Sequence, residues 1–199
     1  MNLTEFKVLL LVVVAVVALL VASPVLQRVL VYPQTEFFTE LWLLGPEHMA
    51  QDYPHNITRG ETYGLFLGLD NHLGEFAYYS VQVKFRNQSQ SGPDSINRTA
   101  SNLAPLYRIN AFLPNDASWE LPITFSFDYS YDPAVSRVDF RSMQFNNAAL
   151  NLDGYSTSRS SDGNVFFGDL IFEVWIYNST IADFQYHERY VDLKLNFMV

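Results

Sequence analysis

The sequence predicts an all-β fold: an immunoglobulin-like antiparallel β-sandwich of about eight strands, preceded by one N-terminal transmembrane helix. Aromatic residues make up 16% of the chain, with 16 Phe and 12 Tyr, and such residues favour strands. Apolar and polar side chains alternate in most segments after the N-terminal region, and Gly, Pro, Asn and Asp separate these segments. Two sheets packed face to face would bury one face of each strand, although a closed barrel is an alternative.

The transmembrane helix is predicted from the run Val8–Leu26, which is apolar except for Ser23 and Pro24. At about 1.5 Å per residue this run spans roughly 28 Å, close to the thickness of a bilayer's hydrocarbon core. A cleaved signal peptide would have a shorter apolar region that ends in an A-x-A-like site. Because Pro24 follows Ala22-Ser23, the only candidate cleavage site suits a peptidase poorly, and we expect an uncleaved anchor.

Four segments follow from this anchor. They are a short cytoplasmic N-terminus (residues 1–7), the helix (8–28), a juxtamembrane linker (29–34) and an extracellular domain (35–199). The charges that flank the predicted helix barely decide its orientation in the membrane, because Lys7 lies at one end of the helix and Arg28 at the other. The N-x-S/T sequons after the anchor place the domain outside the cell and are candidate glycosylation sites. They begin at Asn56, Asn87, Asn97 and Asn178.

The first half of the domain contains four predicted strands, over residues 35–44, 62–70, 76–86 and 107–113. In the second of these, Leu65, Leu67 and Leu69 share one face. The third alternates cleanly, and its apolar face comprises Tyr79, Val81, Val83 and Phe85. A short link joins these two strands and predicts a β-hairpin. The polar segment 87–103 is predicted to be an exposed, mobile loop.

The second half contains strands over residues 119–131, 135–145, 165–177 and 190–199. Pro122 predicts an edge or a bulge in the first of these, and a register change between Phe140 and Met143 predicts a bulge in the second. The segment 165–177 is apolar on both faces, as expected for a central strand. Residues 153–164 are predicted to form a loop, and residues 179–187 a connection that includes a helical turn. The last strand ties the C-terminus into a sheet.

Composition excludes several classes of function. The chain has no cysteine, which excludes disulfide scaffolding, thiol catalysis and cysteine-ligated metal. The net charge of −9 argues against binding to nucleic acid or to anionic lipid. The four histidines lack the spacing of a metal site, and no G-x-S-x-G motif occurs. We therefore expect a protein that is not an enzyme, with no catalytic, cofactor-binding or metal-binding residues; calcium binding and hydrolase activity are minor alternatives.

Several aromatic side chains exceed what one sheet face can bury. Aromatic surfaces form protein interfaces, and aromatic platforms bind sugar rings. A large aromatic core is the simplest explanation of this excess. The candidates for an interface are Phe37, Phe38, Trp42, Trp175 and Tyr177.

Residues 36–86 resemble a family of archaeal membrane proteins known as domain of unknown function 1616. The resemblance rests on the order F-T-E-L-x-L-L-G-P, D-Y-P, G-E, G-L-x-N-H and Y-x-V-x-V, which here runs from Phe38 to Val83. The closing strand near Tyr190 is similar to that of the family, less tightly. Many members have several membrane helices before the domain, whereas one is predicted here. The resemblance implies a membrane-anchored outward β-sandwich in an archaeon and no activity.

The expected function is protein–protein assembly at the cell surface. We expect a membrane-anchored ectodomain that binds a membrane protein or a surface-layer protein at the cell surface, with its anchor helix in the lipid bilayer. A tethered glycan-binding module is the alternative, and an anchored hydrolase is the least favoured.

Overall fold

The computed structural model describes residues 3–29, 37–160 and 165–199, and the chain divides into two compact units, 1–36 and 37–199. The first unit contains the helix α1 (Leu3–Val29). The second is built from strands, and eleven are formed by the described residues. Their bounds are β1 Phe38–Leu44, β2 Asn56–Ile57, β3 Tyr63–His72, β4 Ala77–Asn87, β5 Tyr107–Leu113, β6 Ala117–Asp132, β7 Arg137–Phe145, β8 Ala148–Asn151, β9 Ser156–Ser158, β10 Phe167–Asn178 and β11 Asp183–Phe197.

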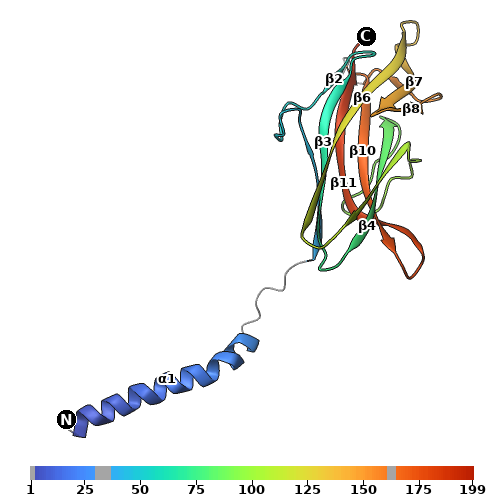
Figure 1. Cartoon of the computed structure of the whole chain (residues 1–199). Coiled ribbons are helices and arrows are strands. Elements are labelled where there is room, and N and C mark those ends of the chain that lie inside the picture. Colours follow the sequence, from blue (N-terminus) through green and yellow to red (C-terminus); the bar gives the residue numbers. More distant parts are fainter. Residues whose placement is uncertain (1–2, 30–36, 161–164) are drawn as a thin grey trace. The chain divides into compact units, whose positions relative to one another are not determined.

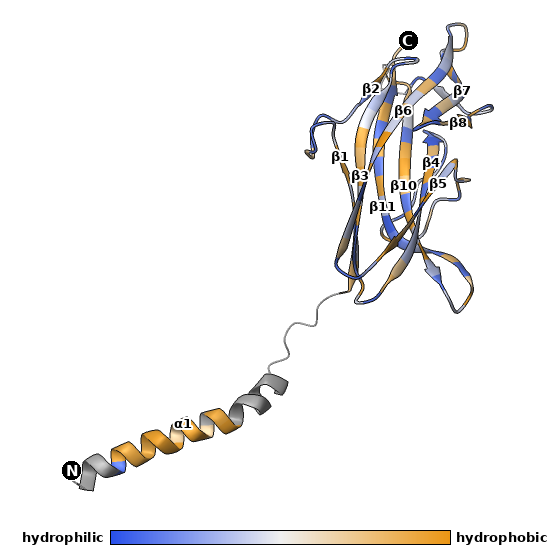
Figure 2. Ribbon diagram, in the orientation of Figure 1, coloured by the Kyte–Doolittle hydropathy of each residue, from blue (hydrophilic) through white to orange (hydrophobic). Residues whose placement is uncertain are grey.

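Helix α1 contains the whole of the predicted apolar run. Its described side chains are apolar apart from Lys7, and Figure 2 shows them as a continuous orange stretch. Those of Val8, Leu11 and Val21 are 65%, 70% and 71% exposed. In the described part of the chain, no helix combines enough length with enough apolarity to cross a membrane. Residues 30–36, which include most of the predicted juxtamembrane linker, lie outside the described residues.

The strands form two sheets that pack as a sandwich (Figure 1). The first sheet has the order β1-β3-β6-β7-β8, with β9 also paired to β7. The second has the order β2-β11-β10-β4-β5. All pairs are antiparallel except that of β2 with β11. As predicted, β10 is central, because β11 and β4 pair with its two edges.

The core lies between the inner faces of the two sheets. The apolar faces predicted for β3 and β4 are buried: Leu65, Leu67 and Leu69 are at most 1% exposed, and Tyr79, Val81, Val83 and Phe85 are fully buried. Rings from both sheets meet edge to face, for example Phe140 and Phe197 at 4.6 Å between centroids. Much of the aromatic excess in the sequence is therefore core packing.

The predicted hairpin between β3 and β4 is wrong. These strands belong to different sheets, since β3 pairs with β1 and β6, whereas β4 pairs with β10 and β5. Residues 73–76 carry the chain across the core from one sheet to the other. Both strands have an apolar face, and two such faces are buried more completely when they oppose each other than when they lie side by side.

Several other predictions about strand irregularities, loops and turns can be compared with the structure. The predicted bulge in β7 is confirmed, because Asp128 pairs with Ser142 and Tyr129 with Phe140, which leaves Arg141 extra. Pro122 lies where β6 pairs only with β3, so it occupies a local edge. The segment 153–164, predicted as a loop, contains β9, and β8 was not predicted. No helical turn forms after β10, because β11 begins at Asp183.

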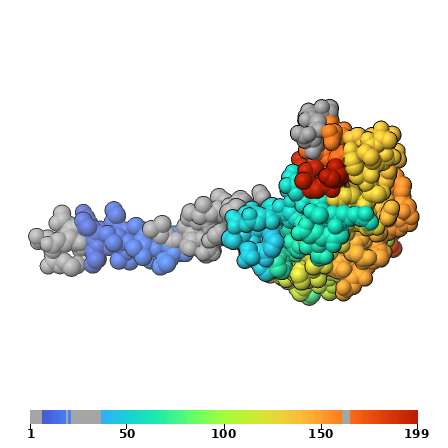
Figure 3. All heavy atoms as spheres, turned by 90° about the horizontal axis from the view of Figure 1, so that it is seen from above, coloured from blue at the N-terminus to red at the C-terminus, as the bar shows by residue number. Residues whose placement is uncertain are grey.

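The C-terminus is tied to the sandwich, as predicted, although β11 ends at Phe197 and Val199 is 61% exposed. The Met198 amide donates to the Ile57 carbonyl at 2.9 Å. The Tyr129 hydroxyl lies 2.8 Å from that carbonyl and 2.7 Å from the Met198 carbonyl. Figure 3 shows the C-terminal residues in red between the cyan and yellow segments.

Candidate functional site

The outer face of the second sheet carries the features that are best suited to binding. Strands β4, β5, β10 and β11 project side chains there at alternate positions. Polar residues dominate the middle of this face, and aromatic residues dominate the end formed by the start of β4, the end of β5 and the β10–β11 hairpin. Two adjoining sites result, an aromatic patch and a polar pocket.

The aromatic patch consists of Phe76, Tyr78, Phe112, Tyr177 and Phe184. Phe76 and Phe112 are each 64% exposed, and their rings stack with centroids 5.6 Å apart. Tyr78 joins this pair to the β10–β11 hairpin, since its centroid lies 6.2 Å from that of Tyr177 and 5.2 Å from that of Phe184. The patch is therefore a continuous group of rings contributed by four parts of the chain.

The loop before β5 covers part of this face and contradicts the expectation of a wholly exposed segment 87–103. Ser101 is only 7% exposed, because it is held by a buried ion pair. The Lys84 ammonium lies 2.7 Å from the Glu173 carboxylate, with side chains 2% and 0% exposed. The Ser101 amide donates to Glu173 at 3.0 Å, and its hydroxyl also donates to that carboxylate. We call these three residues the latch.

A pocket of about 430 Å³ lies beside the latch. Its lining comes from β4, β5, β10, the start of β11 and the loop at Ser101. The lining residues are Ser80, Gln82, Lys84, Ser101, Asn102, Leu103, Pro105, Arg108, Asn110, Trp175, Asp183 and Phe184. Phe184 belongs to both sites, so the pocket and the aromatic patch are contiguous.

Trp175 is held in the pocket by contacts on several sides. Its indole N–H donates to Glu173 at 3.3 Å, and the Lys84 ammonium lies 5.6 Å from the ring centroid. The Tyr186 ring lies 5.9 Å away across the strand pair. Burial, followed by the nearby Glu173 charge, raises the pKa of Tyr186 to about 12, so this phenol stays neutral at physiological pH. The indole is therefore held by Glu173, Lys84 and Tyr186 together.

The predicted interface residues separate into two groups. Trp175 lines the pocket, and Tyr177 belongs to the aromatic patch. Phe38 and Trp42 belong to β1 in the first sheet, where Phe38 stacks on His72 and Trp42 covers Gly68 so closely that a Cβ there would lie 2.0 Å from the indole. Phe37, which is 68% exposed, packs against the turn at Gly74.

Phe76, Phe112 and Phe184 were not among the candidates from the sequence, although a signal existed. In β5 the outward positions read Arg108, Asn110, Phe112, so an aromatic ring interrupts a polar face. In β4 the same holds for Tyr78, which precedes Ser80 and Gln82 on the outward side. Exposed aromatic residues on otherwise polar faces mark the patch.

The four sequons lie at different depths. Asn56 and Asn97 are exposed, whereas Asn87 and Asn178 are half-buried. The Asn87 amide donates to the Ser156 carbonyl at 2.7 Å and that of Asn178 to Gln185 at 3.1 Å. The side chain of Asn97 lies on the loop surface, 2.6 Å from Asp94. Accessibility therefore favours modification of Asn56 and Asn97.

The histidines have separate local partners. His48 lies 3.0 Å from Glu120, His55 bonds the Lys194 carbonyl, and His72 lies 3.0 Å from Asp116. Within the described ranges, no group of three or more His, Cys, Asp or Glu side chains could hold a metal ion. Asp169 is a buried carboxylate beside Arg86, and burial raises its pKa, but the pocket lies elsewhere on the sheet.

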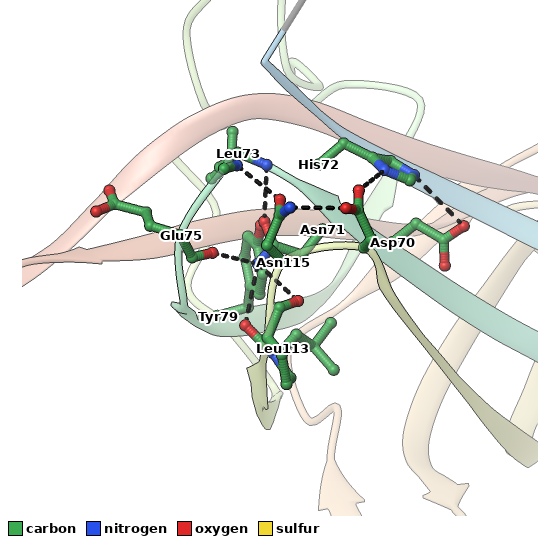
Figure 4. A network of polar contacts seen from close by, with 11 residues as sticks. Asp70, Asn71, His72, Leu73, Glu75, Tyr79, Leu113 and Asn115 are labelled. Carbon is green, nitrogen blue, oxygen red and sulfur yellow. Dashed lines mark hydrogen bonds and ion pairs between the residues drawn. The ribbon is translucent and has the colours of Figure 1, made fainter. Parts of the chain in front are cut away.

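A buried polar network supports the turns at the aromatic end of the sandwich (Figure 4). Asn71 is fully buried, and its amide nitrogen donates to the carbonyls of Glu75, Leu113 and Pro114 at 2.8–3.0 Å. Its oxygen accepts from the Leu73 amide and the Tyr79 hydroxyl. These bonds fix the β3–β4 turn, which contains Phe76, and the β5–β6 turn, which begins just after Phe112 in β5.

The network continues across the core to β11. The Tyr79 hydroxyl lies 3.0 Å from Thr39, whose hydroxyl lies 2.8 Å from Nε2 of His187. Tyr79 gives its only proton to Asn71, so Thr39 donates to Tyr79, and Nε2–H of His187 donates to Thr39. Burial, followed by the charge of Arg189, lowers the pKa of His187, which agrees with a neutral ring.

Comparison with solved structures finds only distant likeness. A beta-glucosidase from Listeria innocua in complex with glucose is 10% identical with a TM-score of 0.34, and the match covers 83% of this chain and 17% of that one. The same enzyme in complex with isofagomine gives 11% identity, a TM-score of 0.35 and the same coverage. This chain thus spans about 17% of the length of those proteins.

Comparison with families is more informative. No curated protein matches the chain. The sequence profile of a family described as a domain of unknown function, DUF1616, matches residues 33–140. This region includes β1 to β6 and most of the residues that carried the resemblance. Because the match spans more than half of the 199 residues, the protein belongs to the DUF1616 family.

Proposed function

We propose that this protein is a membrane-anchored, non-enzymatic ectodomain that assembles with a partner membrane protein at the outer surface of an archaeal cell. The single observation that carries the proposal is the aromatic patch. It places Phe76, Tyr78, Phe112 and Tyr177 on one surface, with exposed fractions of 64%, 37%, 64% and 41%. Contiguous exposed apolar groups of this kind mark interaction sites on folded proteins.

The composition of the patch suits a protein partner. Phenylalanine and tyrosine are enriched at the cores of protein interfaces, where charged residues are depleted. The rings are rigid and mutually packed at 5.2–6.4 Å, so little side-chain entropy is lost on binding. Ile181 lies between Tyr177 and Phe184 in the sequence, in the turn of the β10–β11 hairpin. Its side chain is apolar and 58% exposed.

The anchor is proposed from the sequence of α1. The run Val8–Leu26 has the length and apolarity of a bilayer span, and its described Val and Leu side chains are exposed along the helix. The chain enters the sandwich at Phe37, whose ring packs on the turn at Gly74, two residues before Phe76. The patch therefore borders the N-terminal end of the sandwich.

We also infer that the sandwich is immunoglobulin-like. The first sheet contains β1, β3 and β6 in that order, and the second contains β11, β10, β4 and β5. If the eight longer strands are lettered A, B, C, C′, D, E, F and G along the chain, the second sheet is G-F-C-C′, as in immunoglobulin-type domains with an added strand. The first sheet continues from β6 to β7 and reads A-B-D-E, so its last two strands are exchanged relative to the A-B-E-D order of those domains. In such domains the exposed face of the G-F-C sheet is available for binding.

The test is co-purification of the full chain from its native membrane with a detergent that preserves complexes. The wild type should run in a complex of defined size and constant stoichiometry. The double variant Phe76→Ser, Phe112→Ser should release the partner, because burial of these rings drives association.

The matched control is the double variant Ile96→Ser, Val135→Ser, which removes two apolar side chains that are 89% and 58% exposed and lie outside the patch. It should retain the partner. A wild-type chain that runs alone, or a patch variant that retains the same partner at the same stoichiometry, would contradict the proposal.

A further inference from the structure

Two polar side chains that line the pocket have little exposed surface and no side-chain hydrogen bond to another described residue. Gln82 is 7% exposed and Ser80 is 2% exposed, and both lie on β4 in the lining of the pocket. Within the described residues, no hydrogen bond uses the Gln82 amide or the Ser80 hydroxyl. Their polar atoms are not among the fully buried atoms that lack a partner, so they are reached from the pocket and can bond a ligand there.

The rim offers more unused hydrogen-bonding capacity. Arg108 and Asn110 project from β5, and Asn102 projects from the loop after Ser101. Their side chains form no hydrogen bond or ion pair with any other described residue. Together with Gln82 they present carboxamide groups, which donate and accept, and a guanidinium group, which donates. Such a set matches vicinal hydroxyl groups, each of which also donates and accepts.

Trp175 supplies the apolar element. Its indole lines the same pocket and is held in place by Glu173, Lys84 and Tyr186. An aromatic ring packs well against a ligand that has one apolar face of C–H groups and a rim of polar groups. A sugar ring in the pyranose form has this character.

We propose that the pocket binds one pyranose residue of a glycan, with its C–H face on Trp175 and its hydroxyl groups on Gln82, Asn102, Asn110 and Arg108. The volume of about 430 Å³ lies within the range of roughly 300–1,000 Å³ that is typical of small-molecule sites. A wholly apolar ligand would leave Gln82 and Ser80 unpaired. A polyphosphate would meet the Asp183 carboxylate, and the Lys84 charge is already neutralised by Glu173.

This site is separate from the proposed assembly function. The pocket residues Gln82, Arg108 and Trp175 are not part of the aromatic patch. Sugar binding can therefore fail while the partner is retained, and the partner can be lost while sugar binding persists. The adjoining position of the two sites, through Phe184, would place a bound glycan beside the assembled partner.

The experiment uses the full chain in lipid nanodiscs and avoids glucoside and maltoside detergents, whose headgroups carry the proposed ligand. The chain has three tryptophans, so the background Trp42→Phe, Trp119→Phe leaves Trp175 as the only indole reporter. Fluorescence is recorded during titration with D-glucose, D-galactose, D-mannose, N-acetyl-D-glucosamine and D-glucuronate. At least one sugar should give a saturable change with a Kd on the order of 1 mM.

Three controls make the result specific. Sorbitol carries the hydroxyl groups of glucose without the ring, so it should bind at least about tenfold more weakly. Gln82→Leu should weaken binding of the active sugar by about tenfold or more, because it removes a buried amide of nearly the same size. Gln144→Leu, the same exchange on an exposed position of β7, should leave binding unchanged.

Arg108→Leu tests the pocket independently of folding, because Arg108 is exposed on β5. It should also weaken binding by about tenfold. The proposal is overturned if none of the five sugars gives a saturable signal, if sorbitol binds as well as the active sugar, or if Arg108→Leu binds it as tightly as the parent.

Discussion

Replacement of Lys84 by methionine should strongly destabilise the sandwich and release the loop that holds Ser101. The side chains of Lys84 and Glu173 are 2% and 0% exposed, with 2.7 Å between ammonium and carboxylate. Methionine fills a similar volume but leaves the Glu173 carboxylate buried without its countercharge. The hydrogen bonds from Ser101 and Trp175 remain, yet neither donor carries a charge.

Removal of one partner from a buried ion pair costs about 3–5 kcal/mol in free energy of unfolding. For a domain of this size, each kcal/mol lowers the midpoint of thermal unfolding by about 2–4 °C, so Lys84→Met should lower it by roughly 6–20 °C. The double variant Lys84→Met, Glu173→Leu removes both charges. This double variant should recover most of the lost free energy of unfolding. Because the Ser101 amide is then unpaired, it should remain about 1–3 kcal/mol less stable than the wild type.

The assay is thermal and urea-induced unfolding of the full chain in one fixed lipid environment, followed by amide hydrogen exchange at Ser101. Lys84→Met should increase exchange there relative to the β10 amides. If Lys84→Met lowers the free energy of unfolding by less than about 1 kcal/mol, or if the double variant is less stable than the single one, the buried ion pair is not what holds this loop.

Three further predictions concern other parts of the fold. Because the folded-state pKa of His187 lies below its ordinary value of 6.5, stability should be fully present above pH 6.5 and decline as the pH falls below it; His187→Gln should flatten this slope in urea unfolding. Asn71→Ala leaves several buried groups unpaired and should lower the free energy of unfolding by about 3–5 kcal/mol, whereas a loss under about 1 kcal/mol would mean that water replaces the amide. Mass spectrometry of chain from the native membrane should find a glycan on Asn97 that is absent from Asn97→Gln, and greater occupancy at Asn87 would contradict the accessibility argument.

Part of the binding face could be read from residues alone. Trp175 and Tyr177 stand out because aromatic rings at alternate positions of one strand exceed what a single face can bury. Gln82 and Arg108 could not be identified in this way, since a polar residue at an outward position is ordinarily solvated. The role proposed for them depends on the pocket, which residues from separate strands and from the loop before β5 line together.

The sequence by itself determined the eight longer strands and, in several of them, which face is buried. Alternation of period two is a local property, so the inward faces of β3 and β4 follow from the chain without knowledge of neighbours. The lack of alternation in β10 likewise indicated a central strand. It also located the Arg141 bulge, because a shift in the apolar pattern marks the extra residue.

Only the tertiary structure decided which strands pair and which polar residues lie together. Pairing is a competition between surfaces that are distant in sequence, and a short link such as residues 73–76 is compatible either with a hairpin or with a crossing between sheets. The same holds for the latch, in which Lys84, Ser101 and Glu173 come from three separate segments. Long-range geometry alone brings these charges to 2.7 Å and creates the pocket beside them.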